Sequence, residues 1–599
     1  MSAAPAPPAA SAGGGAPGPS GQGASGARAA AGWSRATGPS WARGLAALLV
    51  CAAVAAAVMW PGLFSGHDTI VGNTGDPSLF VWSLEWTPFA IGHHLNPLVT
   101  DYINYPSGAN LMWNTSIVFP ALVLWPVTAL LGPITSYNVM AFLGMALSGW
   151  CAYLALRRWT RHWLSALAGG LLYMLSPYMA SQISGHPQLF IAVFPPLLVL
   201  LADEILVRQR RPPWLLGMLL GLAAACQLLT GSELLIISAV MAIPALLTLA
   251  AVFRDRVAAR ARYVLRAAVV GVLVFAILAA YPLDVQLFGP LTVHGALQGF
   301  DYYTGLTGFL VPSQLELISG PATVPDSSVY IGLPMLVLAV AVALRLRRRP
   351  EVLVAAVTLV CAALLALGGH LTIHADQRLL PLPWLVFEHL PVLEDVLPVR
   401  IMVAGYLALG LITGVFIDAV IEARPRLRLA GLSVAIVALA PLIPYLPITS
   451  GRFSVPAFFS DGQAARLASS GSVLVTPYGT DQPYTDYAPE VWQAVAGMAF
   501  RTVVAEAFLP GPGGHQWGPA LDPLELELHD LGDLGQPAPG ALSPQQRRSY
   551  LSSLRAHRVT AIVVGPSPGE TQVVEFLREL LGRGGTATGG VVVWTGLRP

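Results

Sequence analysis

The sequence predicts a polytopic α-helical membrane protein with an α/β domain at its C-terminal end. Of the 599 residues, 55% are hydrophobic and only 11% are charged, whereas about a quarter of the residues in an average soluble domain are charged. Apolar runs of roughly 20 residues, the length that crosses a bilayer, recur along the first three quarters of the chain. After residue 448 they give way to polar and Pro/Gly-rich stretches that separate short β-rich runs.

Eleven apolar runs are predicted to span the membrane. They lie at residues 44–63, 136–156, 164–181, 188–206, 214–230, 234–252, 267–287, 329–344, 351–368, 398–421 and 429–447. A further run at 116–131 contains Pro120 and Pro126, so we expect it to lie against the outer membrane surface or to re-enter it rather than to cross. The result is a membrane domain over 43–447 whose first outer loop covers 65–135.

The arginines determine the expected orientation. The sequence has no lysine, and eighteen arginines fall in five of the connections between spans, while the alternate connections hold one, Arg378. Because cytoplasmic loops carry the excess of basic residues, we expect the five basic loops and the N-terminus in the cytoplasm and the C-terminal domain outside. This predicts a multi-pass protein of the inner or plasma membrane.

Residues 1–42 are predicted to form a disordered cytoplasmic tail. They are mostly Ala, Pro, Gly and Ser, and too poor in large apolar side chains to offset chain entropy. A cleavable signal peptide is the alternative, because Arg43 precedes an apolar run that ends in small residues. The tail is longer than an ordinary signal-peptide n-region, which favours an uncleaved first helix.

The C-terminal domain is predicted to cover residues 448–599, enough to bury a core of its own. Its β-rich runs lie at 472–476, 502–505, 560–564 and 590–594. A helix is expected near 571–581, between the last two strands.

The charge balance excludes one class of partner. The chain has 33 basic and 32 acidic residues, a formal net charge of +1. A nucleic-acid-binding protein needs a basic surface, so we expect membrane lipids and no nucleic acid.

The first outer loop carries the main candidate catalytic residue, Asp76. The loop reads Gly-His-Asp-Thr-Ile-Val-Gly-Asn-Thr-Gly-Asp-Pro over 66–77, and an aromatic-rich helical run that includes Glu85 follows it. Such a run is typical of an interfacial helix. Asp76 also has a structural explanation, because Asp before Pro77 is an ideal helix N-cap with proline at the first helical position.

The place of Asp76, just outside the first span and before a membrane-lying helix, resembles the signature of the type C glycosyltransferases. These multispanning enzymes take sugars from polyprenyl-phosphate carriers, and the resemblance implies that Asp76 is the catalytic base or positions the acceptor. The run Gly-Gly-Leu-Leu-Tyr-Met-Leu-Ser-Pro-Tyr-Met-Ala-Ser-Gln-Ile-Ser-Gly-His over 169–186 is similar to the third span and second outer loop of oligosaccharyltransferase catalytic subunits. His186 and Gln188 stand where that family carries an acidic, metal-associated residue. This difference from the family makes a divalent metal cofactor, which the resemblance would otherwise imply, a disfavoured expectation.

The chain is also similar to bacterial membrane proteins of the YfhO group. The shared features are Tyr-Ile-Gly-Leu at 330–333 and Leu-Pro-Val-Arg at 397–400. This resemblance extends over about three quarters of the chain and implies the fold more than the substrate.

Other polar residues of the outer loops are candidates for substrate binding. His93 and His94 lie near Asp101, but the pair lacks ligand spacing and also suits a membrane interface. Glu233, in a tight turn between two spans, either caps the next helix or lines the cavity, and both interpretations stay open.

Arg378 and Arg400 are the candidate phosphate-binding residues. Arg400 stands at a helix start, where its charge opposes the helix dipole, so we expect an anionic partner. That partner is either Glu394 or Asp395, or a lipid phosphate of the donor.

Trp492 belongs to an aromatic cluster with Tyr478, Tyr484 and Tyr487 in the predicted outer domain. Such a cluster could be a sugar-stacking platform that binds substrate. Packing in a core or at an interface is the favoured explanation.

These features predict a membrane glycosyltransferase that moves a sugar from a polyprenyl-phosphate-linked donor to a polysaccharide, lipid or protein of the cell envelope. Asp76 would take the proton of the acceptor hydroxyl, and Arg400 or Arg378 would stabilise the departing phosphate. A transporter or lipid flippase and a non-catalytic scaffold of envelope assembly are the alternatives. The transporter is disfavoured because Glu233 and Asp284 lie near span ends and no internal repeat is visible.

Overall fold

The computed structural model describes ten stretches of the chain, residues 40–294, 304–314, 316–318, 329–373, 378–390, 393–467, 471–478, 487–512, 514–538 and 540–598. Of the predicted tail over 1–42, only residues 40–42 are among them. They begin helix α2 (Ser40–Phe64).

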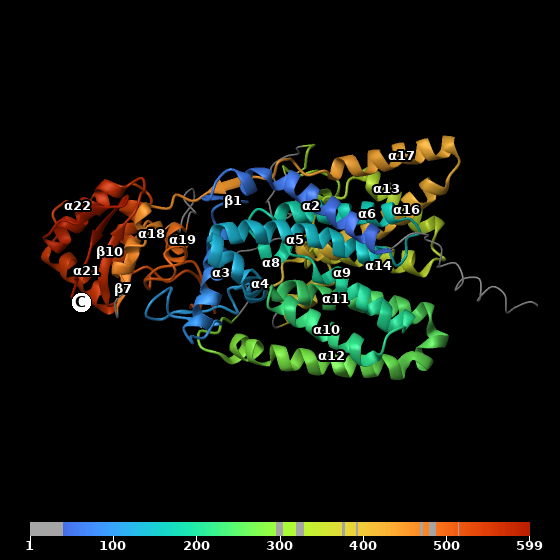
Figure 1. Ribbon diagram of the computed structural model, residues 1–599, viewed down its shortest axis with the longest axis horizontal. Helices are drawn as coiled ribbons and strands as arrows, with labels where there is room; N and C mark the ends of the chain where they lie inside the picture. The colour runs from blue at the N-terminus through green and yellow to red at the C-terminus, as the bar shows by residue number, and fades with distance from the viewer. Residues whose placement is uncertain are drawn as a thin grey trace, which may run out of the picture. The chain divides into compact units, whose positions relative to one another are not determined.

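Seven helices in these stretches are long and apolar enough to cross a membrane (Figure 1). They are α2, α5 (Pro133–Leu156), the segment Pro187–Arg208 with α8 (Pro187–Phe190), α9 (Phe194–Asp203) and η1 (Glu204–Arg208), α11 (Ser232–Val252), α12 (Arg254–Phe288), the segment Pro398–Glu422 with η4 (Pro398–Ile401) and α16 (Met402–Glu422), and the segment Pro425–Leu442 with α17 (Pro425–Leu439) and η5 (Ala440–Leu442).

The other four predicted spans coincide with shorter helices. These are α6 (Trp163–Met174) followed by α7 (Pro177–Gln182), α10 (Pro213–Leu228), α13 (Leu333–Arg345) and α14 (Pro350–Ala366). Because each is shorter than the roughly 20 residues of a typical span, eleven crossings stay a prediction.

Small residues determine how the long helices pack. Gly217 and Gly221 lie four residues apart on α10 and touch α12. A Cβ atom on Gly217 would lie 2.3 Å from the Ala267 carbonyl oxygen, and one on Gly221 would lie 2.4 Å from the Gly271 carbonyl oxygen. Spacing of this kind lets two helix backbones touch. Gly169 on α6 approaches the backbone of α16 in the same way. Glycines therefore let these apolar helices pack with their backbones in contact.

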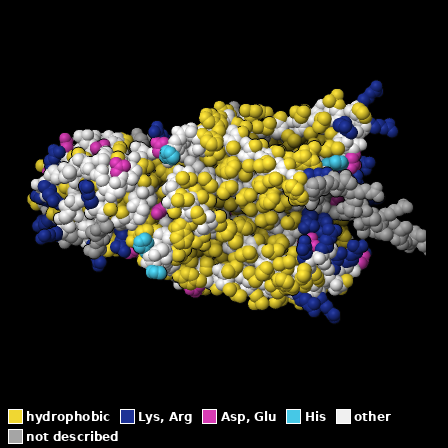
Figure 2. Space-filling view, in the orientation of Figure 1, with side chains coloured by type: hydrophobic (Ala, Val, Ile, Leu, Met, Phe, Trp, Pro, Cys, Tyr) yellow, Lys and Arg dark blue, Asp and Glu magenta, His cyan; other side chains and the backbone are white. Residues whose placement is uncertain are grey.

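The membrane helices carry a broad hydrophobic surface with arginines gathered at one end of it (Figure 2). This surface is not covered by other parts of the protein, since side chains such as Trp60, Ile243 and Ile277 are 54 to 77% exposed. Leucine and isoleucine in such numbers are stable on the outside only against lipid. We call the end with the connections around 157–161, 208–211 and 424–428 the arginine-rich end.

The opposite end is built from the first loop. It contains β1 (Thr69–Val71), α3 (Pro77–Gly92), β2 (Val99–Thr100), β3 (Ala109–Asn110) and α4 (Val118–Leu131). The predicted helix after Pro77 is therefore present. Asn138 of α5 anchors the loop, since its amide accepts from Val71 N and donates to the carbonyl oxygens of Gly62 and Thr69 at 2.7 to 3.0 Å.

Short elements complete this end. They are η2 (Leu306–Phe309), β4 (His370–Leu371), β5 (Leu380–Pro381), α15 (Trp384–Phe387) and β6 (Ser450–Arg452). β6 pairs antiparallel with β1, so the start of the predicted C-terminal domain is hydrogen-bonded to the first loop.

A four-stranded sheet forms the centre of the C-terminal region, in the order β11-β12-β10-β7. The strands are β7 (Ser472–Thr476), β10 (Val559–Val564), β11 (Thr586–Thr588) and β12 (Val591–Trp594), and β10 runs parallel to β7 but antiparallel to β12. One face packs on α20 (Pro523–Gly532), α21 (Pro544–Ala556) and α22 (Glu570–Leu581). The other packs on α18 (Ala457–Ser460), η6 (Gln463–Leu467) and α19 (Ala488–Val495).

The prediction of a strand at 502–505 is wrong. Within this described segment Thr502 alone pairs with a strand, through one isolated β-bridge to Val473. The following backbone amides donate to side chains rather than to a neighbouring strand. Ala505 N donates to Asn104 Oδ1 at 2.9 Å, and Phe508 N donates to Asn114 Oδ1 at 2.6 Å. The segment is thus attached to the first loop, and a short hairpin of β8 (Phe508–Leu509) and β9 (Gln516–Trp517) follows it.

Candidate functional site

Asp76 occupies the N-cap position of α3 but does not cap the helix. Its backbone has helical angles, φ −44° and ψ −34°, and its side chain makes no capping hydrogen bond, whereas a capping residue usually has an extended backbone. Instead, Asp76 Oδ2 lies 3.0 Å from His186 Nε2. The N-cap interpretation is therefore wrong, and the carboxylate is directed at the second loop.

A close contact of two loops brings Asp76 and His186 together. Gly72 has φ +96°, and a Cβ atom there would lie 2.4 Å from the Ser184 carbonyl oxygen. Asn73 N donates to the same oxygen at 2.7 Å. Only glycine fits a left-handed backbone at such a distance, so this residue makes the approach of the two loops sterically feasible.

The surroundings of Asp76 keep it ionised. Burial raises the pKa of the carboxyl, but the His186 hydrogen bond and the positive charges of His186 and Arg400 outweigh burial, and the pKa lies below its ordinary value. A carboxylate held in this form can accept a proton at neutral pH.

Arg400 is paired with Glu233 across two spans. Its Nη1 atom lies 2.7 Å from Glu233 Oε2, and the two side chains are only 11% and 18% exposed. Glu233 Oε1 also accepts from Leu397 N at 3.4 Å, while the N-cap of α11 is Gly231. Glu233 thus holds Arg400 near Asp76 rather than capping its own helix.

Two buried glutamates were missed by sequence reasoning. Glu490 of α19 and Glu506 are 1% and 2% exposed, and the Glu506 backbone N–H donates to Glu490 Oε1. The Ser78 side chain also interacts with Glu490, whereas Glu506 Oε2 has no hydrogen-bond partner among the described residues. Burial raises the pKa of Glu490 to about 8. Burial and the nearby charges of Asp76 and Glu490 raise that of Glu506 well above its usual range.

The other second-loop candidate also lies near this site. Gln188 packs against the turn before Glu233, where a Cβ atom on Gly231 would lie 2.9 Å from Gln188 Cβ. Its Oε1 has no hydrogen-bond partner in the described part of the chain. The structure therefore gathers Asp76, His186, Arg400, Glu233 and Gln188 into one region, which we call the Asp76 cluster.

Three candidates lie beyond the far end of α3. This helix has 16 residues, or about 24 Å of length at 1.5 Å per residue. His93 and His94 follow it, and His93 stacks on Phe89. Asp101 lies 3.2 Å from Arg501 Nε. These residues are not part of the Asp76 cluster.

Glu85 lies on α3 between the two groups. Burial raises its pKa to about 7, so it is partly protonated at neutral pH. No contact with Asp76 is found in the stretches that the structure describes.

Arg378 and Trp492 also lie apart from Asp76. Arg378 is exposed in the connection between β4 and β5. Trp492 is 1% exposed, stacks on Phe459 at 5.1 Å between ring centroids, and donates from Nε1 to the Ser454 carbonyl oxygen at 2.8 Å. These contacts support the packing interpretation of Trp492. Tyr484 lies outside the described residues.

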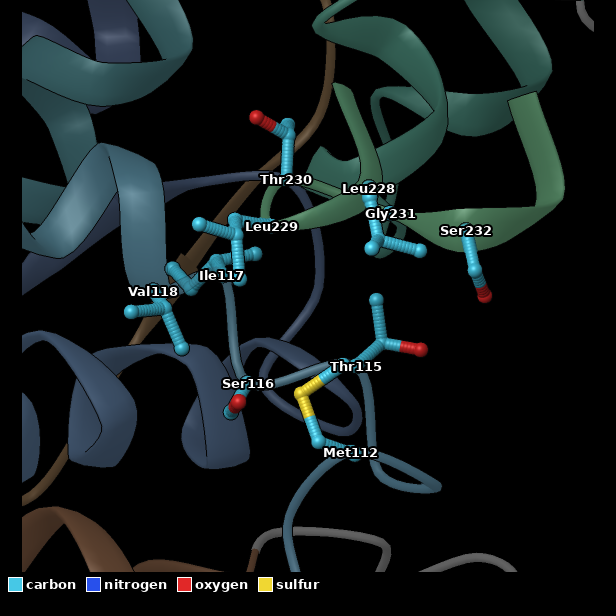
Figure 3. A pocket seen from close by; sticks show the side chains of 10 residues that line it. All are labelled: Met112, Thr115, Ser116, Ile117, Val118, Leu228, Leu229, Thr230, Gly231 and Ser232. Carbon is cyan, nitrogen blue, oxygen red and sulfur yellow. The ribbon is translucent and has the colours of Figure 1, made fainter. Parts of the chain in front are cut away.

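A pocket opens beside the Asp76 cluster (Figure 3). It is small, with a cavity volume of about 10 Å³, and the first loop, from Met112 to Val118, faces the turn from Leu228 to Ser232. Glu233 follows this turn directly. Apolar side chains and four residues with hydroxyl groups, Thr115, Ser116, Thr230 and Ser232, line the pocket.

Asp76 and His186 alone do not make a metal site. Among the described residues, no third His, Cys, Asp or Glu ligand atom lies close enough to this pair to share an ion with it. The cluster offers a proton acceptor, an imidazole and a guanidinium, which suits proton transfer and anion binding.

Comparison with solved structures identifies the fold as type C glycosyltransferase-like, in a multi-pass membrane protein. The arabinofuranosyltransferase AftD from Mycobacteria has a TM-score of 0.50 and 16% identity to this chain, over 94% of this chain and 42% of that chain. The chain itself belongs to the family described as domain of unknown function DUF6311, whose sequence profile matches residues 48–393. No curated protein matches the sequence.

The archaeal oligosaccharyltransferase AglB from Archaeoglobus fulgidus is also similar. In its complex with an inhibitory peptide and a dolichol-phosphate, it has a TM-score of 0.45 and 12% identity, over 88% of this chain and 69% of that chain.

Proposed function

We propose that the protein is a membrane glycosyltransferase that transfers a sugar from a polyprenyl-phosphate-linked donor to an acceptor of the cell envelope on the outer face of the membrane. One observation carries the proposal. Asp76 stands at the start of α3 without capping it, and His186 and Arg400 keep its carboxylate ionised. An aspartate with a purely structural role at this position would accept a hydrogen bond from a backbone N–H group in the first turn of α3.

Asp76 acts as the general base in this proposal. As the acceptor hydroxyl attacks the anomeric carbon, its proton moves to Asp76, and the bond from the anomeric carbon to the phosphate oxygen breaks with its electron pair going to the phosphate. His186 holds Asp76 in place and favours its ionised form. A positioned base of this kind contributes about 10²- to 10⁴-fold to a rate.

Arg400 binds the phosphate of the donor. Its guanidinium is fixed by Glu233 at 2.7 Å, so it is already oriented when the donor arrives, and its charge stabilises the phosphate as the sugar leaves.

A transfer assay tests the proposal. The full chain, purified in lipid nanodiscs, is incubated with radiolabelled polyprenyl-phosphate sugars and envelope fractions as acceptors. We expect label in the acceptor with wild type and a loss of at least a hundredfold with Asp76→Asn, which keeps the shape of the side chain. Binding or bilayer movement of the labelled lipid without transfer would favour the flippase, and transfer by Asp76→Asn at the wild-type rate would overturn the role of Asp76.

A further inference from the structure

A second group of ligating side chains lies in the C-terminal region, where α20 begins and α21 ends. Asp522 is the N-cap of α20, Glu525 lies in its first turn, and His557 is the C-cap of α21. One ligand atom from each lies within 4.8 Å of the others. The three come from both ends of a 36-residue segment, so the fold, rather than sequence spacing, brings them together.

One oxygen of each carboxylate accepts hydrogen bonds from the backbone at the start of α20, and the other oxygen faces His557. Asp522 Oδ1 accepts from the backbone N–H groups of Leu524 and Glu525 at 2.9 and 3.0 Å, and Glu525 Oε2 accepts from Asp522 N at 2.9 Å. This capping box fixes both side chains. The second oxygens, Asp522 Oδ2 and Glu525 Oε1, lie 3.7 and 3.4 Å from His557 Nδ1.

These separations match those around a tetrahedral ion. With metal–ligand bonds of about 2.1 Å, the edges of a tetrahedron are about 3.4 Å long. An ion could therefore bind between the three atoms, which all lie within 4.8 Å of one another. The Ser553 hydroxyl also donates to Asp522 Oδ2, and the second lone pair of that oxygen stays available to an ion.

A buried tyrosine lies within electrostatic range of Glu525 and Asp522. Tyr478 follows β7 and is 3% exposed, and its hydroxyl has no hydrogen-bond partner among the described residues. A buried hydroxyl without a partner is costly, and a water molecule on a bound ion would supply one.

We propose that Asp522, Glu525 and His557 form a binding site for a divalent transition-metal ion of the zinc type, with a water molecule as the fourth ligand beside Tyr478. The imidazole favours zinc over magnesium and calcium, which prefer oxygen ligands alone. The bound ion joins the start of α20 to the end of α21 and so stabilises the C-terminal region. This site is separate from the Asp76 cluster and does not depend on the proposed transfer reaction.

Zinc titration of the full chain tests the site. The protein in nanodiscs is stripped with a chelator, and ZnCl₂ is titrated in competition with a zinc-responsive dye. We expect one zinc ion per chain and a higher melting temperature with zinc. Replacement of zinc by Co²⁺ should give the visible absorption of a tetrahedral ion.

Three variants separate a metal site from a cluster held by hydrogen bonds alone. His557→Gln should abolish the bound equivalent. Asp522→Asn keeps the cap, since Asn caps a helix about as well as Asp, and should weaken zinc at least tenfold in a folded protein. Glu527→Gln is the matched control, because Glu527 is on the same helix but accepts from Tyr550 instead, and it should bind zinc like wild type.

Either of two results would overturn the site. One is a stripped wild-type protein that takes up no zinc equivalent. The other is an Asp522→Asn protein that binds zinc as tightly as Glu527→Gln, since Asp522 Oδ2 would then not be a ligand.

Discussion

Buried carboxylates at the arginine-rich end and near Asp76 have different numbers of partners. At the arginine-rich end, Asp418 of α16 accepts from the backbone N–H groups of Arg161 and His162 and contacts His162 Nδ1, at 2.7 to 3.2 Å. Glu204 contacts Arg158 at 3.1 Å and accepts from Arg210 N at 2.9 Å. These carboxylates hold the connections between helices in place.

Near Asp76 only some carboxylates are tied down to the same degree in the stretches that the structure describes. Glu233 pairs with Arg400 and accepts from Leu397 N, whereas Glu506 Oε2 has no hydrogen bond there and the Asp76 side chain is 43% exposed despite its contact with His186. Buried polar groups that serve structure are normally satisfied. The carboxylates of the arginine-rich end thus hold backbone groups in place, and under the proposed function the Asp76 end would use its carboxylates for a ligand.

The largest effect on stability is expected from Asp418. Asp418→Ala leaves two part-buried backbone donors and an imidazole without their acceptor, which should cost about 2 kcal/mol and lower the melting temperature in nanodiscs by several degrees. Asp76→Ala should change it far less, because Asp76 caps nothing. If Asp76→Ala destabilised the protein as much as Asp418→Ala, the two ends would not differ as we describe.

Arg400→Ala should mainly weaken donor binding. Because a phosphate contact exists before as well as during transfer, we expect the KM for the lipid donor to rise about tenfold with a smaller change in kcat. Arg400→Lys is the control, since it keeps the charge opposite Glu233 but loses the planar guanidinium. Its KM for the lipid donor should lie between those of wild type and Arg400→Ala. A wild-type KM in Arg400→Ala, with a lower melting temperature, would make the pair structural only.

His186→Gln should move the pH dependence of transfer. Transfer needs ionised Asp76, so activity is present above the pKa of Asp76 and is lost as pH falls through it. The hydrogen bond and charge of His186 lower that pKa, so in His186→Gln the acid limb of the kcat/KM profile should lie at higher pH. His93→Gln, beyond the other end of α3, should leave the limb in place. Identical profiles for wild type and His186→Gln would show that His186 does not tune Asp76.

The last expected effect is a pH dependence of stability from Glu490. Its folded pKa is raised from 4.5 to about 8, so the folded state holds a proton that the unfolded chain releases between these values, and stability falls as pH rises through this window. Glu490→Gln has no proton to lose and should show a smaller fall in melting temperature between about pH 5 and pH 9. Glu527→Gln is the control. The same fall in Glu490→Gln and wild type would mean that Glu490 is ionised in the folded protein.

Local sequence signals predicted the elements of this fold well. The strand at 472–476 coincides with β7 and the helix near 571–581 with α22 (Glu570–Leu581), because alternating or helical apolar periodicity reports burial within one element. The strand at 502–505 failed because Ala505 N binds Asn104, about 400 residues earlier, and the following Phe508 N likewise binds Asn114. No local pattern contains such a partner.

The site was predictable only in part. The place of Asp76 and His186 in their loops followed from a family resemblance, but the contact between them depends on how Gly72 lets two distant loops meet. The Asp-Pro pair was misread as a cap because the backbone angles that a cap needs are set by those loops. Glu506 carried a signal that was not used, since it is an acidic residue inside the apolar run Val503–Ala507.

The most direct test of the functional contrast between the two ends is the rate of sugar transfer per folded molecule in Asp76→Asn, measured beside Asp418→Asn in the same nanodiscs. We predict that Asp76→Asn melts at the wild-type temperature and has lost at least a hundredfold in rate, while Asp418→Asn melts lower and keeps its rate per folded molecule. A folded Asp76→Asn protein that transfers sugar at the wild-type rate would contradict the account.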